Sequence, residues 1–386
     1  MPEGVVRKHA RERTVKSKDS IIRVGIIGCG KIALGKHMAG LARIPGVEIT
    51  AFQSRTKAKA LTAAQEFGSK GAKVYDKYSE LLADPQVDVV HICTSNESHA
   101  DLSIAALEAG KHVMCEKPMA LNAAEAERMV ETAERNGKYL SVSYQNRFRK
   151  DAQHLKKLCK DGVLGHIYFA KAHALRRRFI PTWGDFLNKE KQGGGALIDI
   201  GTHALDLTLW LMDNYEPKLV VGKTYNYFGR KENIPMRMTP ESSKEYDIDD
   251  SGFAFIEMKN GASIILESSW ALNTLDFAEA QTTLCGTRAG ADMKNGLRIN
   301  GVSQDALYET HIDAQEEIDP FADSAPGRRE MEAWINAVRE GTQPVVQARQ
   351  ALAVARILDA IYTSSETGQP VLFPESSAER TAAGDS

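Results

Sequence analysis

The amino-acid sequence predicts a two-domain α/β protein, in which a doubly wound parallel sheet is followed by an α+β domain with a large, mostly antiparallel open sheet. Three observations support this prediction. The chain has 386 residues, which is more than a single hydrophobic core usually serves. Short apolar strands alternate with helical patterns as far as Tyr144. Beyond Arg149, several long strands follow one another with few helices between them.

The predicted strands of the first half are apolar on both faces, which is typical of a parallel sheet covered by helices. These strands are Ile22–Ile27, Val47–Phe52, Val87–Cys93, His112–Cys115 and Tyr139–Tyr144. The helical stretches between them are Ala58–Phe67, Leu102–Ala109 and Ala123–Asn136. We expect a first domain over residues 21–148, preceded by a polar, basic tail at residues 1–20 that we interpret as disordered.

The second half has a different rhythm, because strands there follow strands, which indicates antiparallel pairing. The predicted elements are helix Asp151–Lys160, strand Ile167–Ala174, helix Leu197–Met212, strands Leu219–Tyr227, Gly252–Met258, Ser263–Trp270 and Glu279–Cys285, and helices Arg328–Glu340 and Ala348–Glu366. Residues 229–248 are polar with two prolines and predict a surface loop. The second domain is expected over residues 149–374, with a disordered tail at 375–386.

Composition and charge exclude several classes of protein. A net charge of −2 argues against nucleic acid or an anionic membrane as a partner. No apolar run approaches the ~20 residues of a membrane-spanning helix, and the basic tail lacks the apolar stretch of a secretory signal. The cysteines are odd in number and have no metal-ligand spacing, so we expect reduced thiols and a cytoplasmic location; they are Cys29, Cys93, Cys115, Cys159 and Cys285. His99, His112 and His203 are far apart, so no metal site is expected.

A glycine-rich motif joins the first predicted strand to the helix that follows it. The motif is Gly28-Cys29-Gly30-Lys31-Ile32-Ala33, which fits the pattern GxGxx[G/A] in its required context. The first glycine permits a tight turn, and the second lets the backbone approach a pyrophosphate. The start of the helix offers N–H groups and a positive dipole end to phosphates. We therefore predict a dinucleotide site that includes Gly28, Gly30, Lys31 and Ile32, as in Rossmann domains.

The end of the second predicted strand bears on the choice of cofactor. An NAD site normally places a carboxylate there to hold the ribose 2′-hydroxyl, whereas this chain has Ser54 and Arg55. A small hydroxyl and a guanidinium suit a 2′-phosphate. The sequence therefore favours NADP over NAD, with the alternative that Arg55 is simply solvated or stacks on adenine.

Two further motifs connect the chain to a known family. The fifth predicted strand runs into Glu116-Lys117-Pro118, and a second stretch reads Gly193-Gly194-Gly195-Ala196-Leu197-Ile198-Asp199-Ile200-Gly201-Thr202-His203. With Thr94-Ser95-Asn96 and His99 after the fourth strand, the chain resembles the glucose–fructose oxidoreductase/inositol dehydrogenase (Gfo/Idh/MocA) family from about Ile21 to Leu372. The resemblance implies a Rossmann domain, an α/β domain whose open sheet forms a subunit interface, and a homodimer or homotetramer. It also implies cofactor contacts by Thr94, Asn96, His99, Glu116 and Lys117.

The resemblance implies a catalytic trio of Lys117, Asp199 and His203, and the residue types agree with it. Asp199 and His203 are four positions apart on one predicted helix, so they share a face. An imidazole with a pKa near neutrality suits a general base that removes a hydroxyl proton. The Lys117 ammonium would stabilise the alkoxide, and Asp199 would orient the imidazole or bind a neighbouring hydroxyl.

The expected reaction is hydride transfer between nicotinamide and a secondary alcohol of a sugar, glycoside or cyclitol. Residues 176–184 carry arginines and aromatic rings that suit a sugar. This loop also resembles a subgroup that oxidises glycosides at C3. The substrate site is expected to contain Lys117, Arg147, Arg176, Arg178, Trp183, Asp199 and His203, with Lys171 and Phe179 as further candidates. The alternatives are a sugar-sensing regulator without turnover and a glycosidase with resident NAD; Lys117 argues against the regulator.

Overall fold

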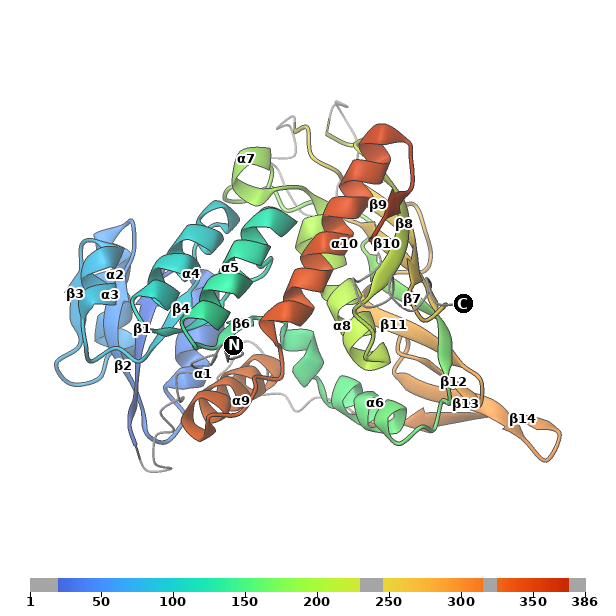
Figure 1. Ribbon diagram of the computed structural model, residues 1–386, viewed down its shortest axis with the longest axis horizontal. Coiled ribbons are helices and arrows are strands. Elements are labelled where there is room, and N and C mark those ends of the chain that lie inside the picture. Colours follow the sequence, from blue (N-terminus) through green and yellow to red (C-terminus); the bar gives the residue numbers. More distant parts are fainter. Residues whose placement is uncertain (1–19, 230–245, 315–324, 375–386) are drawn as a thin grey trace, which may run out of the picture.

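The computed structural model describes residues 20–229, 246–314 and 325–374, which form two lobes that lie side by side (Figure 1). Nearly all of the basic tail at 1–20, most of the polar loop at 229–248 and the tail at 375–386 lie outside the described residues. No helix among those that are described is long and apolar enough to cross a bilayer.

The first lobe is a six-stranded sheet in which every neighbouring pair is parallel, with the order β3-β2-β1-β4-β5-β6. Its strands are β1 (Ile22–Ile27), β2 (Val47–Gln53), β3 (Lys73–Tyr75), β4 (Val89–Ile92), β5 (His112–Cys115) and β6 (Leu140–Val142). Its helices are α1 (Ala39–Leu41), α2 (Lys57–Phe67), α3 (Tyr78–Ala83), α4 (His99–Glu108) and α5 (Ala123–Arg135), with a π-helical turn at Ala33–Met38 before α1. The strand order reverses between β1 and β4, and ligands of such sheets bind at the carboxyl ends of the strands at this point.

The second lobe contains a nine-stranded sheet with the order β14-β13-β12-β11-β7-β10-β9-β8-β15. Its strands are β7 (Ile167–Leu175), β8 (Pro217–Tyr225), β9 (Ser251–Met258), β10 (Ser263–Ser269), β11 (Ala278–Gly286), β12 (Ala289–Asp292), β13 (Leu297–Ser303), β14 (Ala306–Ile312) and β15 (Val371–Leu372). The pairing is antiparallel except between β7 and β10. The predicted fold class of both domains is therefore confirmed.

Helices cover one face of the nine-stranded sheet. The helices of this half are α6 (Lys150–Lys160), α7 (Lys189–Gln192), α8 (Thr202–Met212), α9 (Ala325–Glu340) and α10 (Ala348–Thr367). On β7, Ala170 and Ala172 are buried on the face that contacts α8, whereas Lys171 between them is exposed. This alternation is expected of a sheet with one covered and one open face. It also places Lys171 on the open face, so the expectation that this residue lines a substrate pocket is wrong.

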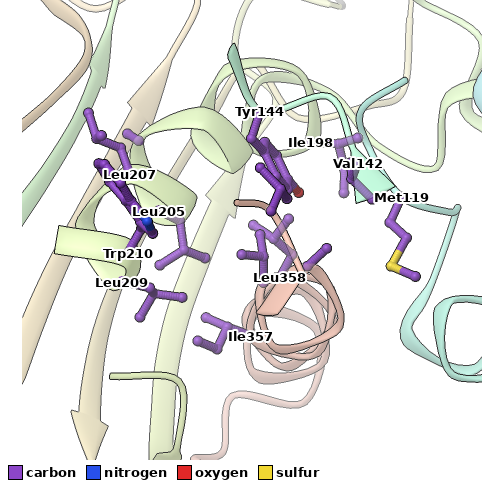
Figure 2. Close-up of a cluster of buried hydrophobic side chains, with 14 of the residues drawn as sticks. Met119, Val142, Tyr144, Ile198, Leu205, Leu207, Leu209, Trp210, Ile357 and Leu358 are labelled. Atoms are coloured by element: carbon purple, nitrogen blue, oxygen red, sulfur yellow. The ribbon is translucent and has the colours of Figure 1, made fainter. Parts of the chain in front are cut away.

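The apolar core is continuous between the lobes, and it fixes how they sit relative to each other. Figure 2 shows Val142 and Tyr144 of the first lobe close to Ile198, and Leu358 of α10 beside them. In addition, α9 packs against α1 and the π-helical turn of the first lobe, although it follows the nine-stranded sheet in sequence. The two lobes are therefore packed against each other through a shared core.

Some predicted elements differ from the observed ones. The predicted helix Leu197–Met212 is a π-helical turn at Leu197–Gly201 followed by α8. The short elements β3 and α3 were not predicted, and neither were β12, β13 and β14. The reason is that β3 has only three residues and that β14 is exposed along nearly its whole length, so neither carries a strong apolar pattern.

Candidate active site

The glycine loop after β1 has the backbone geometry that its sequence predicts. Gly28 has a φ of +92°, and a Cβ there would lie 2.5 Å from the carbonyl oxygen of Cys93. At Gly30 a Cβ would meet nothing within 4 Å, so the space beside this backbone is open. The helical segment starts at Lys31, immediately after the loop. These features leave room for a phosphate group at the start of the helix.

A cleft of about 570 Å³ runs from this loop to the second lobe. Its walls come from both lobes and include Lys31, Ile32, Thr94, Ser95, Asn96, Glu116, Lys117, Pro118, Trp183, Gly184, Asp185, Phe186, Gln192, Gly194, Ile198, Asp199 and Trp270. The amide of Asn96 donates to the carbonyl oxygen of Gln192 at 3.1 Å and so connects the lobes across it. The cleft thus brings together eight of the residues predicted for cofactor and substrate, namely Lys31, Ile32, Thr94, Asn96, Glu116, Lys117, Trp183 and Asp199.

Lys117 and Asp199 form the polar centre of this cleft. The Lys117 Nζ donates to the Asp199 Oδ1 at 3.0 Å and to the Asp199 main-chain oxygen at 2.9 Å. The Trp270 indole donates to the other carboxylate oxygen at 3.0 Å, and the Arg176 guanidinium lies 3.8 Å from it. Burial acts to raise the pKa of Asp199, but Lys117 and Arg176 outweigh it and hold this pKa below its ordinary value. Asp199 is therefore an anion fixed on three sides.

His203 lies one helical turn after Asp199, and the charges of Lys117 and Asp199 both act on it. Burial, with the nearby Lys117 charge, lowers the pKa of His203 to about 3. Its Nδ1 is buried and has no hydrogen-bond partner among the described residues. The Tyr144 ring meets the imidazole edge to face, with the ring centroids 6.3 Å apart. The imidazole is therefore neutral at physiological pH.

Two expectations about His203 are wrong. A pKa near neutrality was expected, but the burial of the ring disfavours its charged form. Of the two roles expected for Asp199, orienting the imidazole is excluded because its carboxylate oxygens are bonded to Lys117 and Trp270, whereas binding a neighbouring hydroxyl stays a prediction. The two side chains follow one another along the helix without a hydrogen bond between them.

Arg147 was predicted to bind substrate, and the structure corrects this. The side chain is fully buried, and its Nε and Nη2 donate to the two carboxylate oxygens of Asp206 at 2.9 and 2.6 Å. Its Nη1 donates to the side chain of Gln350 and to the carbonyl oxygen of Val345. These bonds use the guanidinium to tie the domain junction to α8 and α10.

Arg178 and His99 also lie elsewhere than expected. Arg178 is not among the cleft residues; it donates to the Asn273 side chain at 2.5 Å, and its guanidinium lies over the Phe228 ring. His99 is fully buried, with its Nδ1 2.8 Å from the carbonyl oxygen of Pro118 and its Nε2 3.2 Å from that of Thr94. A cofactor cannot reach such a side chain, so His99 supports the loops of the cleft instead.

The loop at residues 176–184 places Trp183 at the cleft. Trp183 is 49% exposed and lines the cleft, with its ring centroid 5.6 Å from Phe179 and 5.8 Å from Phe186. Arg176 lies over the Phe179 ring and is held by Glu279 at 2.8 Å. An aromatic surface beside charged groups suits a sugar ring.

Sequence reasoning missed several residues of this site. Ile198 stood within the second motif of the resemblance and Trp270 ended a predicted strand, but neither had an assigned role, and none was predicted for Phe186 and Gln192. Trp270 follows β10, and a strand end at a predicted cleft edge is the only sequence signal for it. Its hydrogen bond to Asp199 spans 71 residues and cannot be seen in the sequence.

At the end of β2, Ser54 is half-buried and Arg55 is exposed. Among the residues that the structure describes, Arg55 has no hydrogen-bond or ion-pair partner. The preceding Gln53 donates to the main-chain oxygen of Asp76 at 3.3 Å, and the Asp76 carboxylate is paired with Lys57 at 2.7 Å. Arg55 is thus available to an anionic ligand.

A Rossmann sheet, an open glycine loop and a Lys–Asp pair in one cleft define a dinucleotide-dependent oxidoreductase. The model of the oxidoreductase family GFO_IDH_MocA with an NAD-binding Rossmann fold matches residues 22–144, and that of its C-terminal alpha/beta domain matches residues 156–373. The chain therefore belongs to the Gfo/Idh/MocA oxidoreductase family, and it is an NAD(P)-dependent enzyme of sugar oxidoreduction.

Individual relatives agree with this assignment. The chain is 36% identical to a D-glucoside 3-dehydrogenase of Escherichia coli over 91% of its own length and 97% of that protein. It is 27% identical to a D-xylose 1-dehydrogenase (NADP(+)) of Haloferax volcanii, covering 90% and 98% of the two chains. A crystal structure of an oxidoreductase domain protein from Kribbella flavida superimposes with a TM-score of 0.80 at 25% identity, covering 92% of this chain and all of that one.

Proposed function

We propose that the protein oxidises the C3 hydroxyl of a glucoside, or of a closely related sugar, with a nicotinamide dinucleotide as the hydride acceptor. The observation that carries this proposal is the Lys117–Asp199 pair, which lies in the same cleft as the dinucleotide loop. The similarity to a D-glucoside 3-dehydrogenase over nearly the whole of both chains supports the C3 position.

The residues of the first lobe fit a dinucleotide. The open space at Gly30 and the tight packing at Gly28 are what a bound pyrophosphate requires of this loop. Lys31 and Ile32 would hold the phosphates, and Thr94 and Asn96 would border the nicotinamide half. When bound, the nicotinamide supplies the acceptor for the hydride that leaves the alcohol carbon.

Lys117 is the residue proposed to stabilise the negative charge on the reacting oxygen. An ammonium has three N–H donors, and Asp199 occupies two of them through its side chain and its main-chain oxygen. The third donor remains for the substrate hydroxyl oxygen, which becomes an alkoxide as its proton leaves. Asp199 restricts the direction in which Lys117 can point.

His203 is proposed to accept the hydroxyl proton. The imidazole is neutral and so has a lone pair for the proton, and because its pKa is low the transfer depends on Lys117 to stabilise the alkoxide. The proton is taken from the hydroxyl oxygen while the hydride leaves the carbon that bears this oxygen, and the product is a ketone. Trp183 and Arg176 are proposed to hold the rest of the sugar ring.

NADP is proposed as the preferred cofactor. The support is the end of β2, where Arg55 is exposed and unpaired among the described residues and no carboxylate follows the strand. Adenine stacking by Arg55 is the alternative, which would serve NAD and NADP equally.

We further propose a cytoplasmic homodimer or homotetramer without nucleic-acid or membrane partners. The open face of the nine-stranded sheet supports the oligomer, because it exposes Val221, Tyr225 and Phe255.

The test is a substrate screen with NAD and NADP against glucosides, free sugars and inositols, with the absorbance of the reduced cofactor as the readout. The proposal predicts stoichiometric reduced cofactor and a 3-oxo-glucoside in the product. Release of an aglycone without net cofactor reduction would instead identify a glycosidase. Sugar binding without turnover of any compound would identify a sensor.

A further inference from the structure

A chain of hydrogen bonds between buried side chains runs from α9 to the residue before Lys117. The Trp334 indole donates to the Nε2 of His91 at 3.2 Å. The Nδ1 atoms of His91 and His37 are 2.8 Å apart, and the Nε2 of His37 lies 2.8 Å from the Oε1 of Glu116. Both imidazoles are fully buried, and Trp334 and Glu116 are 2% and 6% exposed.

The chemistry of these groups fixes every proton in the chain. An indole N–H can only donate, so the Nε2 of His91 must be unprotonated. Burial lowers the pKa of His91 and of His37, so each neutral ring carries one proton. The proton of His91 therefore lies on Nδ1 and is donated to the Nδ1 of His37. His37 must then carry its proton on Nε2, where it is donated to Glu116.

Glu116 ends this chain of hydrogen bonds and also accepts a hydrogen bond from the main chain of Lys117. Its Oε2 accepts the backbone N–H of Lys117 at 3.1 Å. Lys36 forms a buried ion pair with the same carboxylate. Burial acts to raise the pKa of Glu116, but Lys36 and His37 outweigh it and hold this pKa well below its ordinary value. Glu116 is therefore a fixed anion, held in place by buried groups at the wall of the cleft.

The members of the chain come from four separate elements. His37 and Lys36 belong to the π-helical turn that follows the dinucleotide loop, and His91 belongs to β4. Glu116 directly follows β5, and Trp334 belongs to α9. The backbone position of Lys117 is thereby tied to the dinucleotide loop and to a helix from the other end of the chain.

We propose that Trp334, His91 and His37 are positioning residues, which hold Glu116 through a one-directional hydrogen-bond chain and thereby fix Lys117 against Asp199 and the substrate oxygen. This inference rests on the proposed role of Lys117. The physical reason is that small displacements of a catalytic group are costly in rate, and a buried chain with one allowed proton arrangement restricts them.

The proton arrangement can be read directly by ¹⁵N NMR of the protein labelled at its histidines. The expected spectrum of the wild type has a bare Nε2 and protonated Nδ1 for His91, and the reverse for His37. In Trp334→Phe the donor to His91 is lost, but the Glu116 anion still holds the proton of His37 on Nε2, so both tautomers should be kept and only the Nε2 signal of His91 should shift. An imidazolium, or a His37 protonated at Nδ1 in the wild type, would overturn the proposal.

The positioning role is tested by kinetics of His91→Leu and His91→Asn. The leucine removes the donor to His37, whereas the asparagine amide can donate from nearly the place of Nδ1. We expect His91→Leu to lower kcat roughly 10- to 100-fold, with the Kd of the reduced cofactor unchanged, and His91→Asn to restore most of kcat. Ser141→Ala is the matched control, because it removes another buried hydrogen bond to the carbonyl oxygen of Val346, on the segment between α9 and α10, and should leave kcat unchanged.

Equal kcat losses in His91→Leu and His91→Asn, or full kcat in a folded His91→Leu, would overturn the proposal. If the leucine variant does not fold, Trp334→Phe replaces it, with a lowered kcat at an unchanged cofactor Kd as the expected result and an unchanged kcat as the contrary one. Failure of the proposed function looks different: Lys117→Ala would then retain turnover, whatever the histidine variants do.

Discussion

At the scale of single residues, Asp199 is held by more partners than its sequence context suggests. Trp270→Phe removes the indole donor to this carboxylate and keeps the aromatic bulk. Because hydrogen bonds to charged groups are the stronger ones, we expect kcat to fall roughly tenfold. Steady-state kinetics with the cofactor Kd measured in parallel tests this, and Trp210→Phe, a buried tryptophan outside the cleft, is the control. An unchanged kcat in Trp270→Phe would contradict the role assigned to Asp199.

His203 leads to a prediction about pH. Since burial lowers its pKa to about 3, the ring is neutral above that value and takes up a proton only as the pH falls toward it. Protonation of His203 should therefore cause no loss of kcat/KM between pH 5 and pH 8. The pH profiles of wild type and His203→Asn should have the same shape in this interval, with the variant lower throughout. A decline near the ordinary histidine pKa that only the wild type shows would contradict the neutral, buried ring.

We expect cofactor choice to depend on two neighbouring side chains, Ser54 and Arg55. Ser54→Asp places a negative charge where a 2′-phosphate would lie, so it should shift the preference from NADP to NAD. Arg55→Ala should weaken NADP more than NAD, by about 1–3 kcal/mol if its hydrogen bonds are charge-assisted. The ratio of kcat/KM for the two cofactors measures both effects. A strong NAD preference in the unmodified protein would show that Arg55 does not bind a phosphate.

At the scale of elements, α9 brings the carboxyl group of Glu330 into the first lobe, and the titration of this group can be measured. Burial raises the pKa of Glu330 to about 7, against the opposing influence of Lys36. A pKa raised above its unfolded value adds stability at low pH, and this contribution is lost as the pH rises through about 7. Glu330→Gln cannot ionise and escapes that loss.

Relative to the wild type, the Gln variant should therefore gain roughly 2 kcal/mol in free energy of unfolding between pH 5.5 and pH 8.5. Urea unfolding of both proteins at the two pH values measures this difference. A difference that does not change with pH would mean that Glu330 is ionised throughout, and one that changes in the opposite direction would mean that its pKa is lowered.

The elements also show what sequence can and cannot predict. Strands such as β1 and β5 were predicted because their apolar residues are buried on both faces, and the turn at Gly28 because few residues tolerate its φ. Lys117 and Asp199 were found through motifs. Arg147 was misassigned because its partner lies 59 residues away, and the His91–Trp334 bond spans 243 residues. Such tertiary pairings leave no local pattern.

At the scale of the whole molecule, the open face of the nine-stranded sheet is the feature that needs explanation. Val221 on β8 and Phe255 on β9 are 41% and 40% exposed, and apolar patches of this kind commonly mark subunit interfaces. A second copy is therefore expected to cover this face. Sedimentation velocity at micromolar concentration should show a dimer or tetramer, and Phe255→Glu should shift it toward monomer. A strictly monomeric wild-type protein would contradict this prediction.

The role of Lys117 in hydride transfer is tested most directly by a single turnover of Lys117→Ala. The reduced cofactor formed from a glucoside that the wild type oxidises would be followed by stopped flow, with Lys70→Ala, an exposed lysine outside the cleft, as the control. We expect the rate to fall by ~10²-fold or more while the cofactor Kd stays unchanged, because the alkoxide loses its ammonium partner. A near-normal rate in the folded Lys117→Ala protein would contradict it.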